Sequence, residues 1–425
     1  EPLNATDIED GPDGALYFCT GGRGTDGGLY RVSWTGKVPA AVLNLGAGIE
    51  EVIRQPQPSS AWARQKLAGI KQRLGDDWEK MLRGVALSTA NPSLYRTRAL
   101  DLLQWLGPVP TPELLARLAG DKDPAVRRKA VQLLGVHGGD DQVDVLVARL
   151  ADDQASIRRA ACEALLRMEK LPPYEKLIPI LASEDRFESW AARRLLERIP
   201  VDGWRDALLD HEQSRVGLQA GLALATSSPT KESSLRIVES IRKRLTAYVS
   251  DRDFLDLLRL TQVAILRGGL TGDDMPELRD SLAEEYPSSN PLMNRELIRI
   301  LTHLQAKGPI ERYLEQLNTL KDPVERVHLA LHLRFVNHEW TSEQKITLIR
   351  FYEEAANFKG GSSYAFYVRN VMRDFAKNLN FEERKLILAE GEKMPNAALA
   401  ALYGLPDEPG EEVLNHLKRI DTALG

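Results

Sequence analysis

Two histidines four residues apart are the side chains in this sequence whose spacing comes closest to a reactive site. His328 and His332 lie one helical turn apart, Glu325 lies one turn before them and His338 follows just beyond. Side chains at i and i+4 share one face of a helix, so this spacing could seat a zinc ion. Leu329 stands where the glutamate of an H-E-x-x-H motif would be, and no third ligand can be placed. We therefore expect no metal site and interpret these histidines as structural or solvated groups.

Three arginines share one column of a 31-residue repeat: Arg96, Arg127 and Arg158. One interpretation is a basic ladder along a groove, which would hold an acidic segment or another polyanion. The alternative is that each arginine bonds to an aspartate in a turn between helices, such as Asp121 or Asp152, and braces adjacent repeats. We favour the bracing role.

Aromatic side chains gather around a glycine-rich segment at 359–363. A platform for a ligand or a carbohydrate is one interpretation. The other, which we favour, is the core of a helical hairpin whose loop is rich in glycine. The side chains are Phe351, Tyr352, Phe358, Tyr364, Phe366, Tyr367 and Phe375.

The chain has two cysteines, Cys19 and Cys162, and they lie in different modules. Cys162 shares a repeat column with Leu100 and Val131, so we expect a buried free thiol. No Ser/His/Asp or Cys/His arrangement can be nominated as a nucleophile. The sequence therefore predicts no catalytic residue, no cofactor-binding residue and no metal ligand.

The framework that positions these residues is a helical repeat. Four alanines recur every 31 residues, and a leucine follows each of them by four positions. A small and a large residue at i and i+4 lie on one helical face, which predicts stacked helical hairpins. A single hairpin cannot bury its apolar face alone, so neighbours stack into a solenoid. The alanines are Ala99, Ala130, Ala161 and Ala192, and the leucines are Leu103, Leu134, Leu165 and Leu196.

Two segments of the chain resemble HEAT repeats. The 31-residue period and this resemblance predict an all-α fold, a right-handed HEAT-like (ARM-type) α-solenoid, and residues 1–36 are expected to add a short β hairpin at the N-terminus. The second helices of the solenoid would form a concave surface that binds a protein partner. The matching positions are Leu118, Asp121 and 126–130 in one segment, and Leu150, Asp153 and 157–161 in the next.

We expect the chain to be organised as four segments: a β hairpin at 1–36, a linker at 37–60, regular HEAT-like repeats at 61–199 and irregular HEAT-like helical repeats at 200–425. Typical helix lengths suggest on the order of 18 to 20 helices. Caps mark many of their ends. The expected N-caps are Ser60, Asp77, Asp123, Ser183, Asn290 and Asn380, the expected capping box joins Thr341 to Gln344, and Gly75 is an expected C-cap.

Residues 1–36 differ from the rest of the chain. A turn cluster at 10–14 precedes an alternating run at 15–20, and a glycine-rich loop leads to a second run at 28–34. The pattern predicts two antiparallel strands. A two-stranded hairpin is marginal alone, so either the helical body or a larger β-domain must cover it.

The same N-terminal residues resemble one blade of a six-bladed propeller. The matching segments are 6–8, 11–18, 21–25 and 27–32. The closest type is the sorbosone/glucose dehydrogenase-like propeller of large secreted proteins from planctomycete-type bacteria, in which HEAT-like repeats and often a haem-binding cytochrome c module follow. The resemblance implies a periplasmic or secreted location. One blade forms no central cavity, so Arg23 has none to face, and no C-x-x-C-H haem site occurs in the sequence.

The charge balance narrows the classes of partner. A net charge of -5 argues against nucleic acid, which requires a concentrated basic surface, and no run of apolar residues is long enough for a membrane span. We therefore predict a non-catalytic scaffold that binds a protein partner or a neighbouring domain of its own parent protein. The alternative is a segment of a secreted sugar or alcohol dehydrogenase-like protein whose redox centres lie elsewhere.

Overall fold

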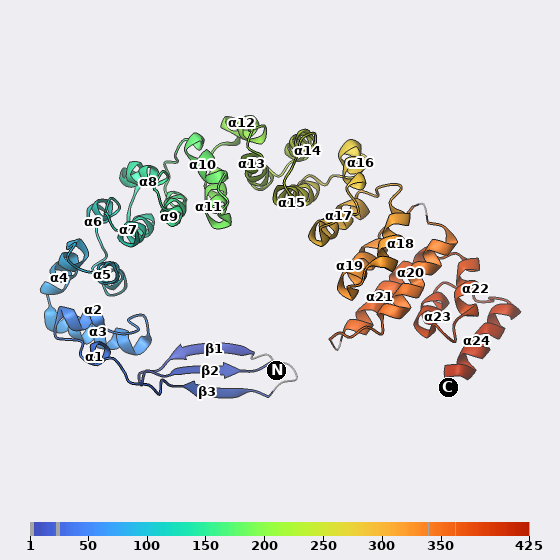
Figure 1. Ribbon diagram of the computed structural model, residues 1–425, viewed down its shortest axis with the longest axis horizontal. Helices are drawn as coiled ribbons and strands as arrows, with labels where there is room; N and C mark the ends of the chain where they lie inside the picture. The colour runs from blue at the N-terminus through green and yellow to red at the C-terminus, as the bar shows by residue number, and fades with distance from the viewer. Residues whose placement is uncertain (1–3, 23–25, 339, 362, 425) are drawn as a thin grey trace. The chain divides into compact units, whose positions relative to one another are not determined.

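The computed structural model describes residues 4–22, 26–338, 340–361 and 363–424, and in these residues the chain is predominantly helical. Helices follow one another in stacked pairs, after a small antiparallel sheet at the N-terminus (Figure 1). This confirms the expected α-solenoid. The chain divides into two compact units, Glu1–Ile199 and Pro200–Gly425, and each is described by itself.

The N-terminal sheet has three strands, in the order β1(Ala5–Asp10), β2(Leu16–Thr20) and β3(Gly28–Val32). The two expected antiparallel strands are confirmed as β2 and β3, but the expectation missed a third strand, because β1 pairs with β2 in an antiparallel register. Asp7, Glu9 and Asp10 make half of β1 acidic, so it lacks the apolar run that identified β2 and β3. Residues 23–25, which belong to the expected turn between the later strands, and Arg23 with them, lie outside the described residues.

Helices of unit 1 begin within the segment expected as a linker. Helix α2 buries Val52 and Ile53, which explains why this part of 37–60 is ordered. The helices of unit 1 are α1(Ala40–Leu43), α2(Ile49–Arg54), α3(Ala61–Leu74), α4(Asp77–Leu87), α5(Ser93–Leu106), α6(Pro112–Leu118), α7(Pro124–His137), α8(Val143–Arg149), α9(Ala155–Leu165), α10(Ile178–Leu181) and α11(Arg186–Leu196), with the 3₁₀ helices η1(Asp140–Gln142) and η2(Tyr174–Leu177).

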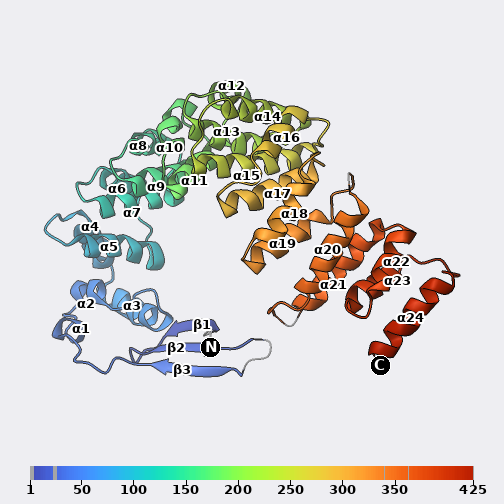
Figure 2. The same cartoon turned by 45° about the vertical axis from the view of Figure 1, so that its right-hand side comes forward.

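Four hairpins of unit 1 stack in sequence: α4 with α5, α6 with α7, α8 with α9 and α10 with α11. Their second helices, α5, α7, α9 and α11, pack one against the next, and the first helices form a separate row (Figures 1 and 2). The repeated alanines and leucines are fully buried between these rows, as the 31-residue period predicts.

Unit 2 continues with helical pairs whose lengths vary more. Helices α13, α15, α17 and α19 again pack in succession, whereas α20 contacts α21, α22 and α23. The helices are α12(Arg205–Leu209), α13(Ser214–Ser227), α14(Lys231–Leu245), α15(Asp251–Gly268), α16(Pro276–Glu284), α17(Pro291–His303), α18(Ile310–Thr319), α19(Pro323–Leu333), α20(Ser342–Ala355), α21(Tyr364–Phe375), α22(Phe381–Ala389), α23(Pro395–Leu402) and α24(Glu411–Leu424), with η3(Val201–Gly203) and η4(Ala376–Asn378).

The α helices of the described residues are numbered up to α24, so they outnumber the 18 to 20 helices expected. Short helices such as α1, α10 and α12 were missed because they have too few residues to show a period. Most capping predictions are confirmed. Side chains cap the helices at Ser60, Asp123, Asn290, Thr341 and Asn380, and Gly75 ends α3.

Two capping predictions were wrong. Asp185 caps α11 in place of Ser183, whose hydroxyl instead accepts from the Asp185 N–H. Helix α4 already includes Asp77, and Asp76 before it makes no side-chain cap. Within the described residues, none of the helices combines the length and hydropathy that a bilayer crossing requires.

Candidate functional site

The arginine column braces consecutive repeats in unit 1. Arg96 forms a bidentate pair with Asp121, with Nη1 donating to Oδ1 at 3.0 Å. Arg127 also forms a bidentate pair with Asp152, through Nε and Nη2, which donate at 3.0 and 2.9 Å. Each aspartate lies in the turn before the second helix of the following repeat. The bracing interpretation is confirmed.

The third rung uses a different acid. Arg158 pairs with Glu188, and Ser183, at the position that corresponds to Asp121 and Asp152, donates its hydroxyl to the same carboxylate at 2.6 Å. Glu188 is almost fully buried. All three column arginines therefore hold carboxylates of the solenoid itself and are not available to a partner.

Electrostatics support this assignment. Burial raises the pKa of Asp152, but the hydrogen bonds from Arg127 and from the Gln154 N–H outweigh burial, and the net pKa is lowered. The pKa of Asp121 is lowered by Arg96 and the Asp123 N–H against the same opposing effect of burial. Both carboxylates are thus charged at neutral pH.

The same 31-residue period identifies the residues on the exposed face of the second helices. One column contains Thr97, Arg128, Arg159 and Trp190, and another contains Leu94, Ala125, Ser156 and Phe187. None of these side chains is buried. We call this exposed face of α5, α7, α9 and α11 the second-helix face of unit 1.

An aromatic pair stands at the α11 end of this face. Phe187 and Trp190 are one turn apart, and they are 50% and 44% exposed. Two guanidinium groups flank the Phe187 ring: Arg186 lies 4.7 Å and Arg159 5.3 Å from its centroid. Aromatic residues and arginines are enriched among the residues that contribute most of the binding energy in protein interfaces.

The second helices of unit 1 are also basic. Helices α5, α7, α9 and α11 carry ten arginine or lysine residues and three carboxylates. The whole chain, by contrast, has a net charge of -5. The sequence analysis missed this face because it treated the repeat columns as packing positions. The columns next to the arginine ladder already contain Arg159, Phe187 and Trp190.

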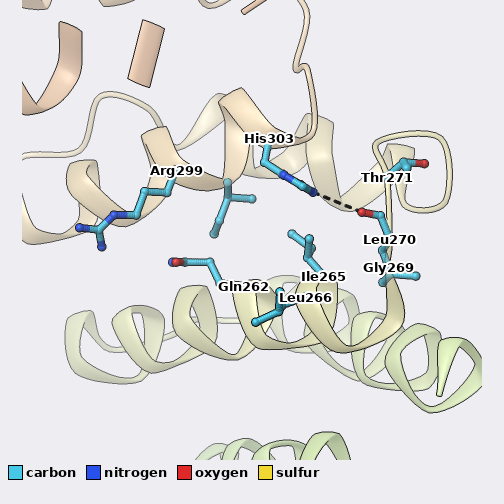
Figure 3. A pocket seen from close by; sticks show the side chains of 9 residues that line it. Gln262, Ile265, Leu266, Gly269, Leu270, Thr271, Arg299 and His303 are labelled. Atoms are coloured by element: carbon cyan, nitrogen blue, oxygen red, sulfur yellow. Dashed lines mark hydrogen bonds between the residues drawn. The ribbon is translucent and has the colours of Figure 1, made fainter. Parts of the chain in front are cut away.

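A groove of about 450 Å³ lies between α15 and α17 in unit 2. Figure 3 shows Gln262, Ile265 and Leu266 on α15 opposite Arg299 and His303 on α17. Apolar side chains supply most of the lining. The polar ones are engaged: Gln262 and Arg299 each donate to the Glu296 carboxylate at 2.8 Å, and the His303 ring nitrogen lies 3.4 Å from the Leu270 carbonyl oxygen. The groove offers an apolar contact rather than a reactive centre.

The two histidines at i and i+4 lie against one another in α19, with ring centroids 4.5 Å apart. His332 Nδ1 lies 2.8 Å from the His328 carbonyl oxygen and donates a hydrogen bond to it, while His328 Nε2 lies 3.4 Å from the Arg295 carbonyl oxygen. Burial lowers the pKa of both rings, and nearby positive charge lowers it further. Among the described residues, no group of three or more His, Cys, Asp or Glu side chains is placed to hold a metal ion.

The aromatic cluster of unit 2 is divided between core and surface. Phe351 and Tyr352 on α20 and Phe375 on α21 are buried, and the Tyr352 hydroxyl donates to the Ala330 carbonyl of α19 at 2.7 Å. The core interpretation is confirmed for these three. It was wrong for Phe366 and Tyr367, which are exposed on the first turn of α21. Ser362, in the glycine-rich segment, lies outside the described residues.

The two cysteines differ in access. Cys162 is a fully buried free thiol, as predicted, and burial raises its pKa well above the ordinary range. Cys19 is exposed on β2. A buried thiol with a raised pKa is a poor nucleophile, so Cys162 acts as a packing residue.

The N-terminal sheet leaves one apolar face open. Ile8, Phe18 and Tyr30 are in register across the three strands, with the Phe18 and Tyr30 rings stacked at 5.0 Å. Leu16 and Val32 form the next rung, and four of these five side chains are exposed.

The turn between β1 and β2 is tied to β3 by charge. Asp13 accepts from Arg31 at 2.8 Å and from the Tyr17 hydroxyl at 2.9 Å. These bonds, with the Arg31 contact foremost, lower the pKa of Asp13 to about 2. The sheet is thus locally fixed at this end while its apolar face remains uncovered.

Part of unit 1 is similar to a known protein family. Residues 72–167 and 111–197 match the family model of HEAT repeats. This supports the HEAT-like part of the expectation and covers the region of the arginine ladder. Among curated proteins, none matches this sequence.

Proposed function

We propose that this chain is a non-catalytic scaffold that binds a protein partner, or a neighbouring domain of its own parent protein, on the second-helix face of unit 1. HEAT repeats commonly act as interaction scaffolds. The observation that carries the proposal is the exposure of Phe187 and Trp190 beside Arg159 and Arg186. Two large aromatic side chains on one helical turn gain free energy when a partner removes them from water.

The regular stacking of the second helices supports the same proposal. Because α5, α7, α9 and α11 are held in register by the buried ladder, their exposed side chains form a fixed array. A preorganised surface loses little side-chain entropy on binding. The ladder then serves recognition indirectly, by positioning the face.

A photo-crosslinking amino acid placed at position 190 tests this proposal in the native host. We expect a reproducible adduct with one protein or domain, which diminishes when Phe187→Ser is added. The matched control places the same amino acid at position 113, an exposed site on the first helix α6. Identical adducts from both positions, or none from position 190, would contradict a face-specific scaffold.

A second candidate is a segment of a secreted or periplasmic sugar or alcohol dehydrogenase-like protein, with its redox centres outside this chain. The open apolar face of the N-terminal sheet favours it, since Ile8, Tyr30 and Val32 have the composition of a surface that packs on further β-structure. Amide hydrogen exchange of the chain alone tests this candidate. Rapid exchange across β1–β3 would support it, whereas strong protection would show that the sheet needs no additional β-structure.

A further inference from the structure

We propose that the second-helix face of unit 1 recognises an acidic protein segment that carries a bulky apolar side chain. The proposal rests on the scaffold function and names the chemistry of its partner. Carboxylates of the segment would pair with arginines of the face, and its apolar side chain would pack against Phe187 and Trp190.

The charge of the face is the first argument. Of the ten basic residues in α5, α7, α9 and α11, three belong to the ladder and are neutralised by turn carboxylates and Glu188. Arg128 and Arg186 are exposed, and in the described part of the chain neither has a carboxylate partner. In a chain of net charge -5, a local basic surface that the fold does not itself neutralise is complementary to an acidic ligand.

The geometry around Phe187 is the second argument. A guanidinium that stacks on an aromatic ring uses its flat face, and its N–H donors remain in the plane at its edge. The Arg186 guanidinium carbon lies over the Phe187 ring, 4.7 Å from its centroid, and Arg186 makes no ion pair among the described residues. One cluster can therefore hold an apolar side chain on its rings and a carboxylate on its arginine edge.

A nucleic acid is the less favoured occupant. Phosphate binding needs many unpaired cations along a continuous track. Here Lys129 is paired with Asp101, Arg159 with Glu163 and Arg194 with Glu197, so the exposed cations are few and are separated by apolar side chains. The combination fits an amphipathic acidic peptide.

Selection from a random 12-residue peptide display library on the full chain tests the proposal. We expect enriched sequences with aspartate or glutamate near phenylalanine, leucine or tryptophan. A synthetic peptide of the enriched sequence should bind at least about tenfold more tightly than its Glu→Gln counterpart, and salt should weaken its binding. Enrichment of neutral or basic sequences, no enrichment, or tighter binding of a 20-base-pair DNA duplex would overturn the proposal.

Variants locate the contact and separate it from the scaffold function. Arg128→Gln with Arg186→Gln should weaken the acidic peptide about tenfold or more, and Arg117→Gln on α6 is the matched exposed control. Circular dichroism melting curves establish that each variant folds. If Trp190→Ser abolishes peptide binding while the arginine variants do not change it, the acidic inference fails and the scaffold function stands. If position 190 also gives no crosslink in the host, the scaffold function fails as well.

Discussion

Replacing Arg127 by methionine should destabilise unit 1 through one buried carboxylate. The guanidinium donates to Asp152 at 2.9 and 3.0 Å, to Asp153 at 2.7 Å, and to the carbonyls of Asp121 and Lys122 at 3.1 Å. The Asp153 carboxylate is largely exposed and can return to water. The side chain of Asp152 is 3% exposed and cannot.

The magnitude follows from what remains around Asp152. Removing one partner of a buried ion pair costs about 3–5 kcal/mol, because an unpaired charge stays behind. The Gln154 N–H still donates to this carboxylate at 3.1 Å, and Arg149 lies 3.5 Å away. We therefore expect Arg127→Met to lower the free energy of unfolding by about 2–4 kcal/mol.

Urea unfolding followed by circular dichroism measures this change. The control is Arg128→Met, the same substitution one position later on an exposed side chain, which should change the free energy of unfolding by no more than about 0.5 kcal/mol. Adding Asp152→Leu to Arg127→Met should recover part of the loss, since no buried charge is then left unpaired. If the two methionine variants are equally stable, the ladder does not brace the repeats and the reasoning fails.

Two further predictions concern the packing of other helices. The pKa of His328 and of His332 is lowered in the folded chain, so the unfolded chain binds protons first as the pH falls. The free energy of unfolding should therefore decrease as the pH drops below about 6.5. Replacing both histidines by glutamine should flatten this pH dependence in urea titrations at pH 5 to 8. A Cβ at Gly135 would lie 2.8 Å from Ala164 Cα, so Gly135→Ala should lower the free energy of unfolding by about 1–3 kcal/mol in the same assay. The control is Gly84→Ala, which has open space around it and should not destabilise the chain. Equal effects of the two substitutions would refute the close approach of α7 and α9.

The regular part of the fold was predictable because its information is local. A period of 31 residues fixes which alanine and leucine share a face, and side-chain caps such as Ser60 and Asp123 mark where helices begin. The strand β1 and the helix α2 were not predictable in this way. Asp7 and Glu9 give β1 acidic residues in place of the apolar run that usually identifies a strand. Helix α2 has six residues, which is too short to show a helical period.

The candidate site depended on tertiary structure to a greater degree. In the sequence, Arg159 and Trp190 share one repeat column and Phe187 lies in another, and the spacing does not show whether these side chains are exposed. Their exposure follows from the stacking of α9 and α11, which buries one side of each second helix and leaves the other in water. The aromatic cluster near 351–375 shows the same limit, because composition alone could not separate the buried Phe375 from the exposed Phe366.

The sequence by itself determined the stacked helical hairpins, because they follow from residue types repeated at a fixed spacing along the chain, and it favoured a bracing role for the arginine column. Only the tertiary structure decided which acids the column meets, with Glu188 in place of an aspartate at the third rung, and which side chains remain for a partner. The physical reason is that periodicity fixes a residue's face on its own helix, whereas pairing and exposure depend on the helix that packs against it.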